Sequence, residues 1–172
     1  MIILQAVLLT SFPTLVIIAG LTDLVSFTIP NRISLGLLAI FAPACLLLGQ
    51  PWPAIAVSVA VGIAALLAGM AMFAVGWIGG GDAKLFAVVC LWLGLGAMPT
   101  FLLVTALSGG GLAVLLLNVR SAWIRPHLNG APAWLDRLTT PGADVPYGVA
   151  IAAGALAAFP QCALVHGLQA TI

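Results

Sequence analysis

The sequence AIAVSVAVGIAALLAGMAMFAVG occupies residues 54–76 and contains no charged side chain. As an α-helix with a rise of 1.5 Å per residue, this run would extend roughly 34 Å, which is enough to cross the hydrocarbon core of a bilayer, about 30 Å thick. A strand of a membrane barrel would instead alternate apolar and polar residues, and this run does not. It therefore predicts a membrane-spanning helix.

The composition of the whole chain agrees with a membrane environment. Of its 172 residues, 63% are hydrophobic and 5% are charged, whereas an ordinary soluble domain carries about 25% charged residues. Five Lys/Arg and four Asp/Glu residues are too few to cover a water-facing surface. In lipid every backbone amide needs an internal partner, and unbroken apolar runs satisfy this requirement as helices. We therefore expect an all-α membrane protein, a polytopic bundle of transmembrane helices.

Proline, glycine and charged residues interrupt the apolar runs and mark the ends of the expected helices. Six transmembrane helices are predicted, at about 2–22, 33–49, 54–76, 83–97, 100–119 and 147–169. We expect them to form one domain over residues 1–172, with a more polar loop at about 120–146. A cleaved signal peptide would begin with a positive segment. Here the first basic residue, Arg32, follows the first apolar run, which predicts a retained first helix.

The basic residues are confined to the connections on one side of the predicted bundle. They are Arg32, Lys84, Arg120, Arg125 and Arg137. The connections on the other side, 49–53 and 96–99, carry no charge. The positive-inside rule therefore places the basic connections in the cytoplasm and both termini outside. The same assignment puts Asp23 and Asp82 at the cytoplasmic ends of their helices.

Several classes of partner are not expected from this sequence. The net charge is +1 without a basic cluster, which argues against a nucleic-acid partner. The cysteines Cys45, Cys90 and Cys162 lie far apart inside apolar runs. Because they show neither metal-ligand nor disulfide spacing, we interpret them as packing residues and expect no metal. No bound cofactor is implied by the sequence either.

Two acidic residues stand at the ends of apolar runs, where Asp23 follows one span and Asp82 opens another. Ionisable residues at membrane depth are costly and usually face a bundle interior or a water-filled cavity. Two carboxylates brought together can share one proton, so that one activates water while the other polarises a peptide carbonyl. A single Asp at a helix boundary is more often a cap or an interfacial residue. Spacing alone leaves both interpretations open.

The residues around Asp82 favour a functional interpretation. Gly79, Gly80 and Gly81 precede it, and glycine permits close backbone approach. A substrate strand or a neighbouring helix is therefore expected against this backbone. Lys84 is two positions from Asp82 and points to the opposite side of a helix. We expect Lys84 to contact lipid headgroups or an acidic substrate residue, and Asn31 is a second candidate for such a contact, the alternative being a simple turn residue.

Three stretches together resemble the bacterial type IV prepilin peptidases. Asp23 followed after a short spacer by Ile29-Pro30-Asn31 is similar to the first signature of that family. Residues 79–85, GGGDAKL, resemble the second signature, Gly-x-Gly-Asp-x-Lys. Residues 145–151, VPYGVAI, are similar to the stretch that enters the last helix of the family. The three matches occur in the same order and span most of the chain.

The resemblance implies an intramembrane aspartyl endopeptidase, with Asp23 and Asp82 at the positions of the catalytic pair. Such enzymes remove the short basic leader of prepilins at the cytoplasmic face of the bacterial inner membrane. The compact length is most similar to members that serve Flp-type (tight-adherence) pili. The implied partners are the lipid bilayer and a Flp-type prepilin or pseudopilin, and the oligomeric state is left open.

The resemblance is incomplete in one respect. Longer prepilin peptidases carry an N-terminal cytoplasmic region with paired Cys-x-x-Cys motifs, and many also methylate the new pilin N-terminus. The sequence contains neither that region nor those motifs. N-methyltransferase activity is therefore not predicted.

Two alternative functions were weighed against this interpretation. Intramembrane proteases of the signal-peptide-peptidase and presenilin type also use Gly-x-Gly-Asp, but they pair it with Tyr-Asp, whereas Thr22 precedes Asp23 here. A different class is a small proton-coupled transporter or a pilus or secretion assembly subunit, with a non-catalytic Asp pair as proton site. The predicted position of both carboxylates near one face, rather than at mid-membrane, argues against it.

Overall fold

The computed structural model describes residues 1–121 and 132–169, and within them every regular element is a helix. The elements are α1 (Ile2–Ser26), α2 (Asn31–Leu47), α3 (Trp52–Ala74), α4 (Gly80–Val119), α5 (Ala133–Thr139), α6 (Tyr147–Ala158), the 3₁₀ turn η2 (Phe159–Gln161) and α7 (Ala163–Gln169). The predicted all-α class is confirmed. Residues 122–131 of the predicted loop, with Arg125, lie outside the described residues.

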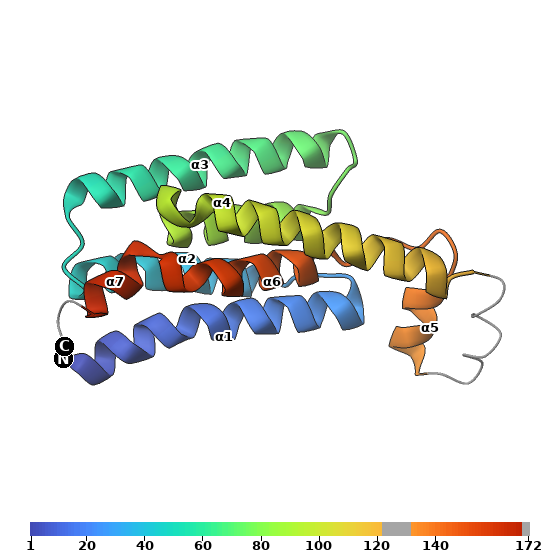
Figure 1. Cartoon of the computed structure of the whole chain (residues 1–172), viewed down its shortest axis with the longest axis horizontal. Helices are drawn as coiled ribbons and strands as arrows, with labels where there is room; N and C mark the ends of the chain where they lie inside the picture. The colour runs from blue at the N-terminus through green and yellow to red at the C-terminus, as the bar shows by residue number, and fades with distance from the viewer. Residues whose placement is uncertain (122–131, 170–172) are drawn as a thin grey trace.

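The long helices lie side by side along one axis, and both termini are at the same end of the bundle (Figure 1). The short helix α5 lies at the opposite end, next to the ends of α1 and α4 (Figure 1). Four segments are long and apolar enough to cross a membrane: Ile3–Ser26, Trp52–Ala74, Gly80–Val119 and Tyr147–Gly167. The apolar helix α2 is shorter. These lengths confirm a membrane bundle, and the count of six spans stays a prediction.

Helix α4 consists of two arms, residues 80–93 and residues 95–119, that meet at a sharp break. Gly94 has φ 63° and ψ −175°, a conformation that L side chains rarely adopt and glycine tolerates. The arms run antiparallel, because the ring centroids of Phe86 and Phe101 lie only 5.5 Å apart. The predicted break at 96–99 was therefore placed too late. Gly96 and Pro99 mark the region, but the reversal occurs at Gly94, which is the glycine of α4 that has a positive φ.

Two other predicted boundaries are corrected by the structure. Helix α1 continues to Ser26, so Asp23 lies in its last turn rather than after its end. The predicted helix 147–169 is interrupted by η2, which contains Pro160. Proline removes a backbone donor and ends regular helical hydrogen bonding there. Part of the predicted polar loop forms the surface helix α5.

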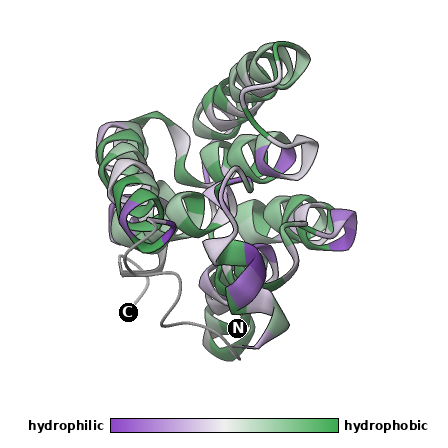
Figure 2. Cartoon of the chain, turned by 90° about the vertical axis from the view of Figure 1, so that its right-hand side faces the viewer, coloured by the Kyte–Doolittle hydropathy of each residue, from purple (hydrophilic) through white to green (hydrophobic). Residues whose placement is uncertain are grey.

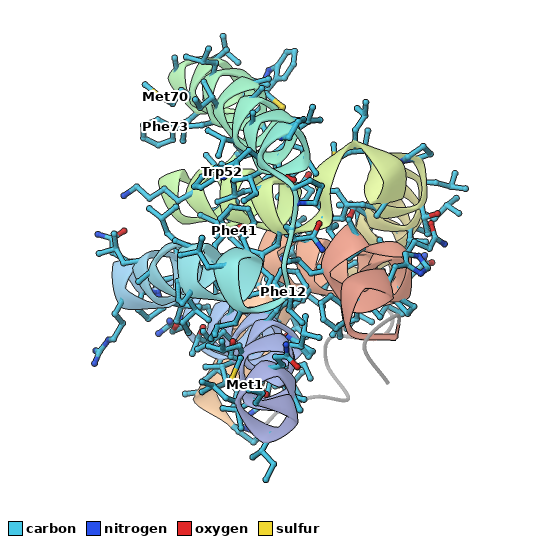
Figure 3. All side chains as sticks on the ribbon, turned by 90° about the vertical axis from the view of Figure 1, so that its left-hand side faces the viewer. Met1, Phe12, Phe41, Trp52, Met70 and Phe73 are labelled. Carbon is cyan, nitrogen blue, oxygen red and sulfur yellow. The ribbon has the colours of Figure 1, made fainter. Side chains whose placement is uncertain are left out.

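The core of the bundle is centred on Trp92, which is almost completely buried in the first arm of α4. Its indole Nε1–H donates to the Leu37 carbonyl at 2.9 Å. Its ring centroid lies 5.1 Å from that of Phe12 and 5.8 Å from that of Phe41. Figure 3 shows both phenylalanines toward the middle of the bundle. The indole therefore packs α1, α2 and α4 against one another.

Helix α3 is the most peripheral long helix and presents apolar side chains away from the bundle. Its Met70 and Phe73 are more than half exposed, and both point outward in Figure 3. Hydrophobic residues also cover most of the helical surface in Figure 2, where hydrophilic patches appear toward the viewer. Exposed apolar side chains of this kind face hydrocarbon in a membrane protein. The lipid-facing surface and the polar end are thus separated along the bundle axis.

Candidate active site

The two buried acidic residues lie at the end of the bundle opposite the termini. Asp23 comes from the last turn of α1 and is 4% exposed, and Asp82 comes from the first turn of α4 and is 9% exposed. Both line one cavity of about 250 Å³. Its other walls are the connection between α3 and α4 and the start of α6. The structure therefore brings together the two carboxylates that the sequence singled out.

The Asp23 carboxylate is held by the first turn of α6. The Gly148 backbone N–H donates to Asp23 Oδ2 at 2.7 Å. The first backbone N–H groups of a helix have no partner within it, so the start of α6 has a free donor to offer. The approach is close, because a Cβ at Gly148 would lie 2.8 Å from Asp23 Oδ2. A residue without a side chain is what allows α6 to begin directly against Asp23.

Asp82 occupies the third position of α4 and lines the same cavity as Asp23. Its Oδ2 lies beside Gly79, where an added Cβ would be 3.0 Å away. Its Oδ1 is buried, and no protein group among the described residues forms a hydrogen bond with it. A buried carboxylate oxygen without a partner is costly unless water or a ligand satisfies it. The described protein groups therefore leave the Asp82 carboxylate only partly satisfied.

The glycines before Asp82 allow the close approach that the sequence predicted. A Cβ at Gly81 would lie 3.2 Å from the Cβ of Ile29, and a Cβ at Gly80 would lie 3.5 Å from the Phe73 ring. The neighbour at Gly81 is the α1–α2 connection. Ile29 also contacts α6, since a Cβ at Gly148 would be 2.8 Å from Ile29 Cδ1. Ile29 thus packs between the start of α4 and the start of α6.

The structure brings Lys84 and Asn31 together, and neither residue lines the cavity of the carboxylate pair. Lys84 Nζ donates to Asn31 Oδ1 at 2.9 Å, and both side chains are exposed. This contact joins the start of α2 to the start of α4. The predicted contact of either residue with a lipid headgroup or a substrate stays a prediction.

The model of the type IV leader peptidase family matches residues 10–114, more than half of the chain. The chain belongs to the type IV leader peptidase family. A curated relative, the prepilin leader peptidase/N-methyltransferase of Bacillus subtilis (strain 168), is 32% identical over 149 residues, which are 86% of this chain and 53% of the relative. The chain thus spans about half the length of that relative. No solved structure gives a significant match.

Two residues contribute to the site of this leader peptidase family member in ways that the sequence did not indicate. Gly148 lies within the third matching stretch, which predicted the start of a helix but no contact with Asp23. Arg120 ends α4, and its guanidinium donates to the carbonyls of Leu138, Ala143 and Asp144 at 2.8, 2.8 and 2.9 Å. Arg120 therefore fixes the segment that leads into α6. Its position within the predicted loop was interpreted only as a topology signal.

Proposed function

We propose that this chain is an intramembrane aspartyl endopeptidase that removes the leader peptide of type IV prepilins, with Asp23 and Asp82 as the catalytic pair. One observation carries the proposal: two buried carboxylates from distant parts of the chain line the same cavity of about 250 Å³. The family to which the chain belongs supports a peptidase. The printed name of the Bacillus subtilis relative supports a prepilin as the substrate.

The arrangement supports general acid–base hydrolysis of a peptide bond. Two adjacent carboxylates cannot easily both ionise, so they share one proton. The ionised member removes a proton from a water molecule that attacks the carbonyl carbon, and the protonated member polarises the carbonyl oxygen. Proton transfer to the leaving amine then completes cleavage. The N-termini of α4 and α6 both meet the pair, and helix N-termini favour a negative charge on it.

The depth of the pair favours cleavage near the membrane surface. Asp23 is three residues before the end of α1, and Asp82 is the third residue of α4, which places them roughly 3–5 Å inside the helix ends. The starts of α2 and α4 and the end of α4, which carry Arg32, Lys84 and Arg120, lie at the same end of the bundle (Figure 1). On the positive-inside rule we propose that this end faces the cytoplasm of a bacterial inner membrane.

The decisive experiment measures leader removal by the purified chain in liposomes. A Flp-type prepilin is incubated with wild-type protein and with the Asp23→Asn, Asp82→Asn and Asp136→Asn variants, and products are identified by mass spectrometry. Wild-type and Asp136→Asn protein should cleave, because Asp136 is exposed on α5. Either substitution in the pair should abolish cleavage while insertion is retained. Near-normal turnover by either variant would disprove the catalytic assignment.

The substrate class needs its own comparison. The Flp-type assignment rests on the resemblance in sequence, so a non-Flp type IV prepilin serves as the competing substrate at equal concentration. Faster cleavage of the Flp-type prepilin supports the assignment. Equal or reversed rates would remove it and leave the peptidase proposal intact.

A further inference from the structure

An apolar crevice adjoins the carboxylate cavity. It has a volume of about 250 Å³ and shares Ile78, Asp82 and Tyr147 with that cavity. Its other walls come from Met72 of α3, from both arms of α4 and from the first half of α6. The proposed hydrolysis does not use this space, although it ends on one of the two carboxylates.

The crevice runs from the carboxylates toward the interior of the bundle. Along the first arm of α4 its wall extends from Asp82 to Phe86, and along α6 it extends from Tyr147 to Ile151. Four residues of helix correspond to about 6 Å. Phe86, which packs against the buried ring of Phe101, stands at the inner end. A crevice of about this length can hold one or two side chains. It cannot hold a whole helix, which is about 10 Å across.

The lining of the crevice indicates what kind of group fills it. Apart from the Asp82 carboxylate and the hydroxyls of Thr105 and Tyr147, it consists of apolar side chains and glycines. Burying a charged side chain against such a wall is costly. The crevice therefore fits apolar side chains of a peptide whose scissile bond lies at Asp82, and it does not fit the basic residues of a leader.

We propose that this crevice is a substrate subsite that takes the apolar side chains of the first one or two residues after the scissile bond, on the membrane side of the cleavage point. The inference rests on the proposed peptidase function and adds a specificity site to it. A larger apolar groove of about 580 Å³ lies between α2, α3 and the first arm of α4, but neither Asp23 nor Asp82 lines it. The smaller crevice is selected because it reaches the reacting groups.

Adjacent glycines of α4 provide a matched test. A Cβ at Gly110 or at Gly111 would meet nothing within 4 Å, yet only Gly110 lines the crevice. Gly110→Leu should fill the crevice, and Gly111→Leu should not. For a prepilin with Phe directly after the scissile bond, Gly110→Leu should lower kcat/KM by about tenfold or more, the usual scale of an apolar pocket mismatch. The decrease should be smaller for the same prepilin with Ala there, and Gly111→Leu should leave both rates unchanged.

A second measurement does not depend on cleavage. The same prepilin carries a photoreactive leucine directly after the scissile bond and is irradiated with the Asp23→Asn variant, whose substituted residue does not line the crevice. Crosslinks to Phe86 or to residues 105–110 support the subsite, and crosslinks to residues 59–66 of the larger groove overturn it. If wild-type protein cleaves while Gly110→Leu lowers both rates equally or not at all, the subsite is refuted and the peptidase stands. If wild-type protein cleaves neither prepilin, the peptidase proposal fails and the crosslinks alone decide the subsite.

Discussion

Adding one methyl group at Gly148 should disable the site without touching either carboxylate chemically. In Gly148→Ala the new Cβ would lie 2.8 Å from Asp23 Oδ2, 2.8 Å from Ile29 Cδ1 and 2.9 Å from Asp23 Cβ. Real Cβ atoms essentially never show contacts under 3.0 Å. Because the three contacts come from two different residues, rotation of one side chain cannot relieve them all. Helix α6 must move away from Asp23, and the 2.7 Å hydrogen bond is lost or lengthened.

The expected size of the effect follows from that hydrogen bond. Hydrogen bonds to charged groups contribute about 1.5–3 kcal/mol. If this amount is lost in the transition state, kcat/KM falls roughly ten- to 150-fold, at about 1.4 kcal/mol for each factor of ten. Overpacking adds a stability cost of about 1–3 kcal/mol. The variant should therefore unfold at a lower temperature and cleave far more slowly than wild type.

Cleavage kinetics in liposomes and thermal unfolding in detergent measure the two effects separately. Gly111→Ala is the matched control, since a Cβ there meets nothing within 4 Å and alanine favours a helix over glycine. It should retain wild-type kcat/KM and equal or higher stability. Wild-type kcat/KM in Gly148→Ala would show that the contact between α6 and Asp23 does not support catalysis.

Three further results are expected. Arg120→Gln removes the charged donors to the carbonyls of Leu138, Ala143 and Asp144. It should lower the unfolding temperature and should lower kcat/KM by about tenfold, and an unchanged unfolding temperature would contradict the positioning role of Arg120. Lys84→Met breaks only an exposed hydrogen bond and should cost at most about fivefold in kcat/KM, whereas a larger loss would indicate a substrate contact. A membrane-impermeant maleimide should label Trp52→Cys in intact cells and Asp136→Cys only after permeabilisation, and the reverse pattern would invert the topology.

The fold class could be predicted because it depends on properties that are visible one segment at a time. Apolar runs of the length of residues 54–76 require helices in lipid whatever surrounds them. The break in α4 was harder, because several glycines and a proline lie close together and only the positive φ of Gly94 distinguishes the true reversal. The end of α1 was misplaced for a related reason. Asp23 was interpreted as ending the helix, yet the helix continues for three residues to Ser26.

The candidate site was predictable in its acidic residues but not in the groups that hold them. Asp23 and Asp82 stand out as rare charges among apolar runs. Their partner Gly148 is separated from Asp23 by 125 positions, and a glycine near a helix start carries no local sign of the carboxylate that it meets. The role of Arg120 was missed because its three acceptors are backbone carbonyls, which no side-chain pattern reveals.

The three stretches that resemble the prepilin peptidase signatures meet around Ile29. Helix α1 ends after Ser26, and Phe27, with φ 54°, turns the chain back so that Ile29 is buried beside the carboxylates. One side of Ile29 contacts Gly81 at the start of α4, and its Cδ1 contacts Gly148 at the start of α6. Those two helix starts are the elements that hold Asp82 and bind Asp23. The spacing from Asp23 to Ile29-Pro30-Asn31 therefore has a physical meaning: it sets the position of the side chain that packs against both helix N-termini.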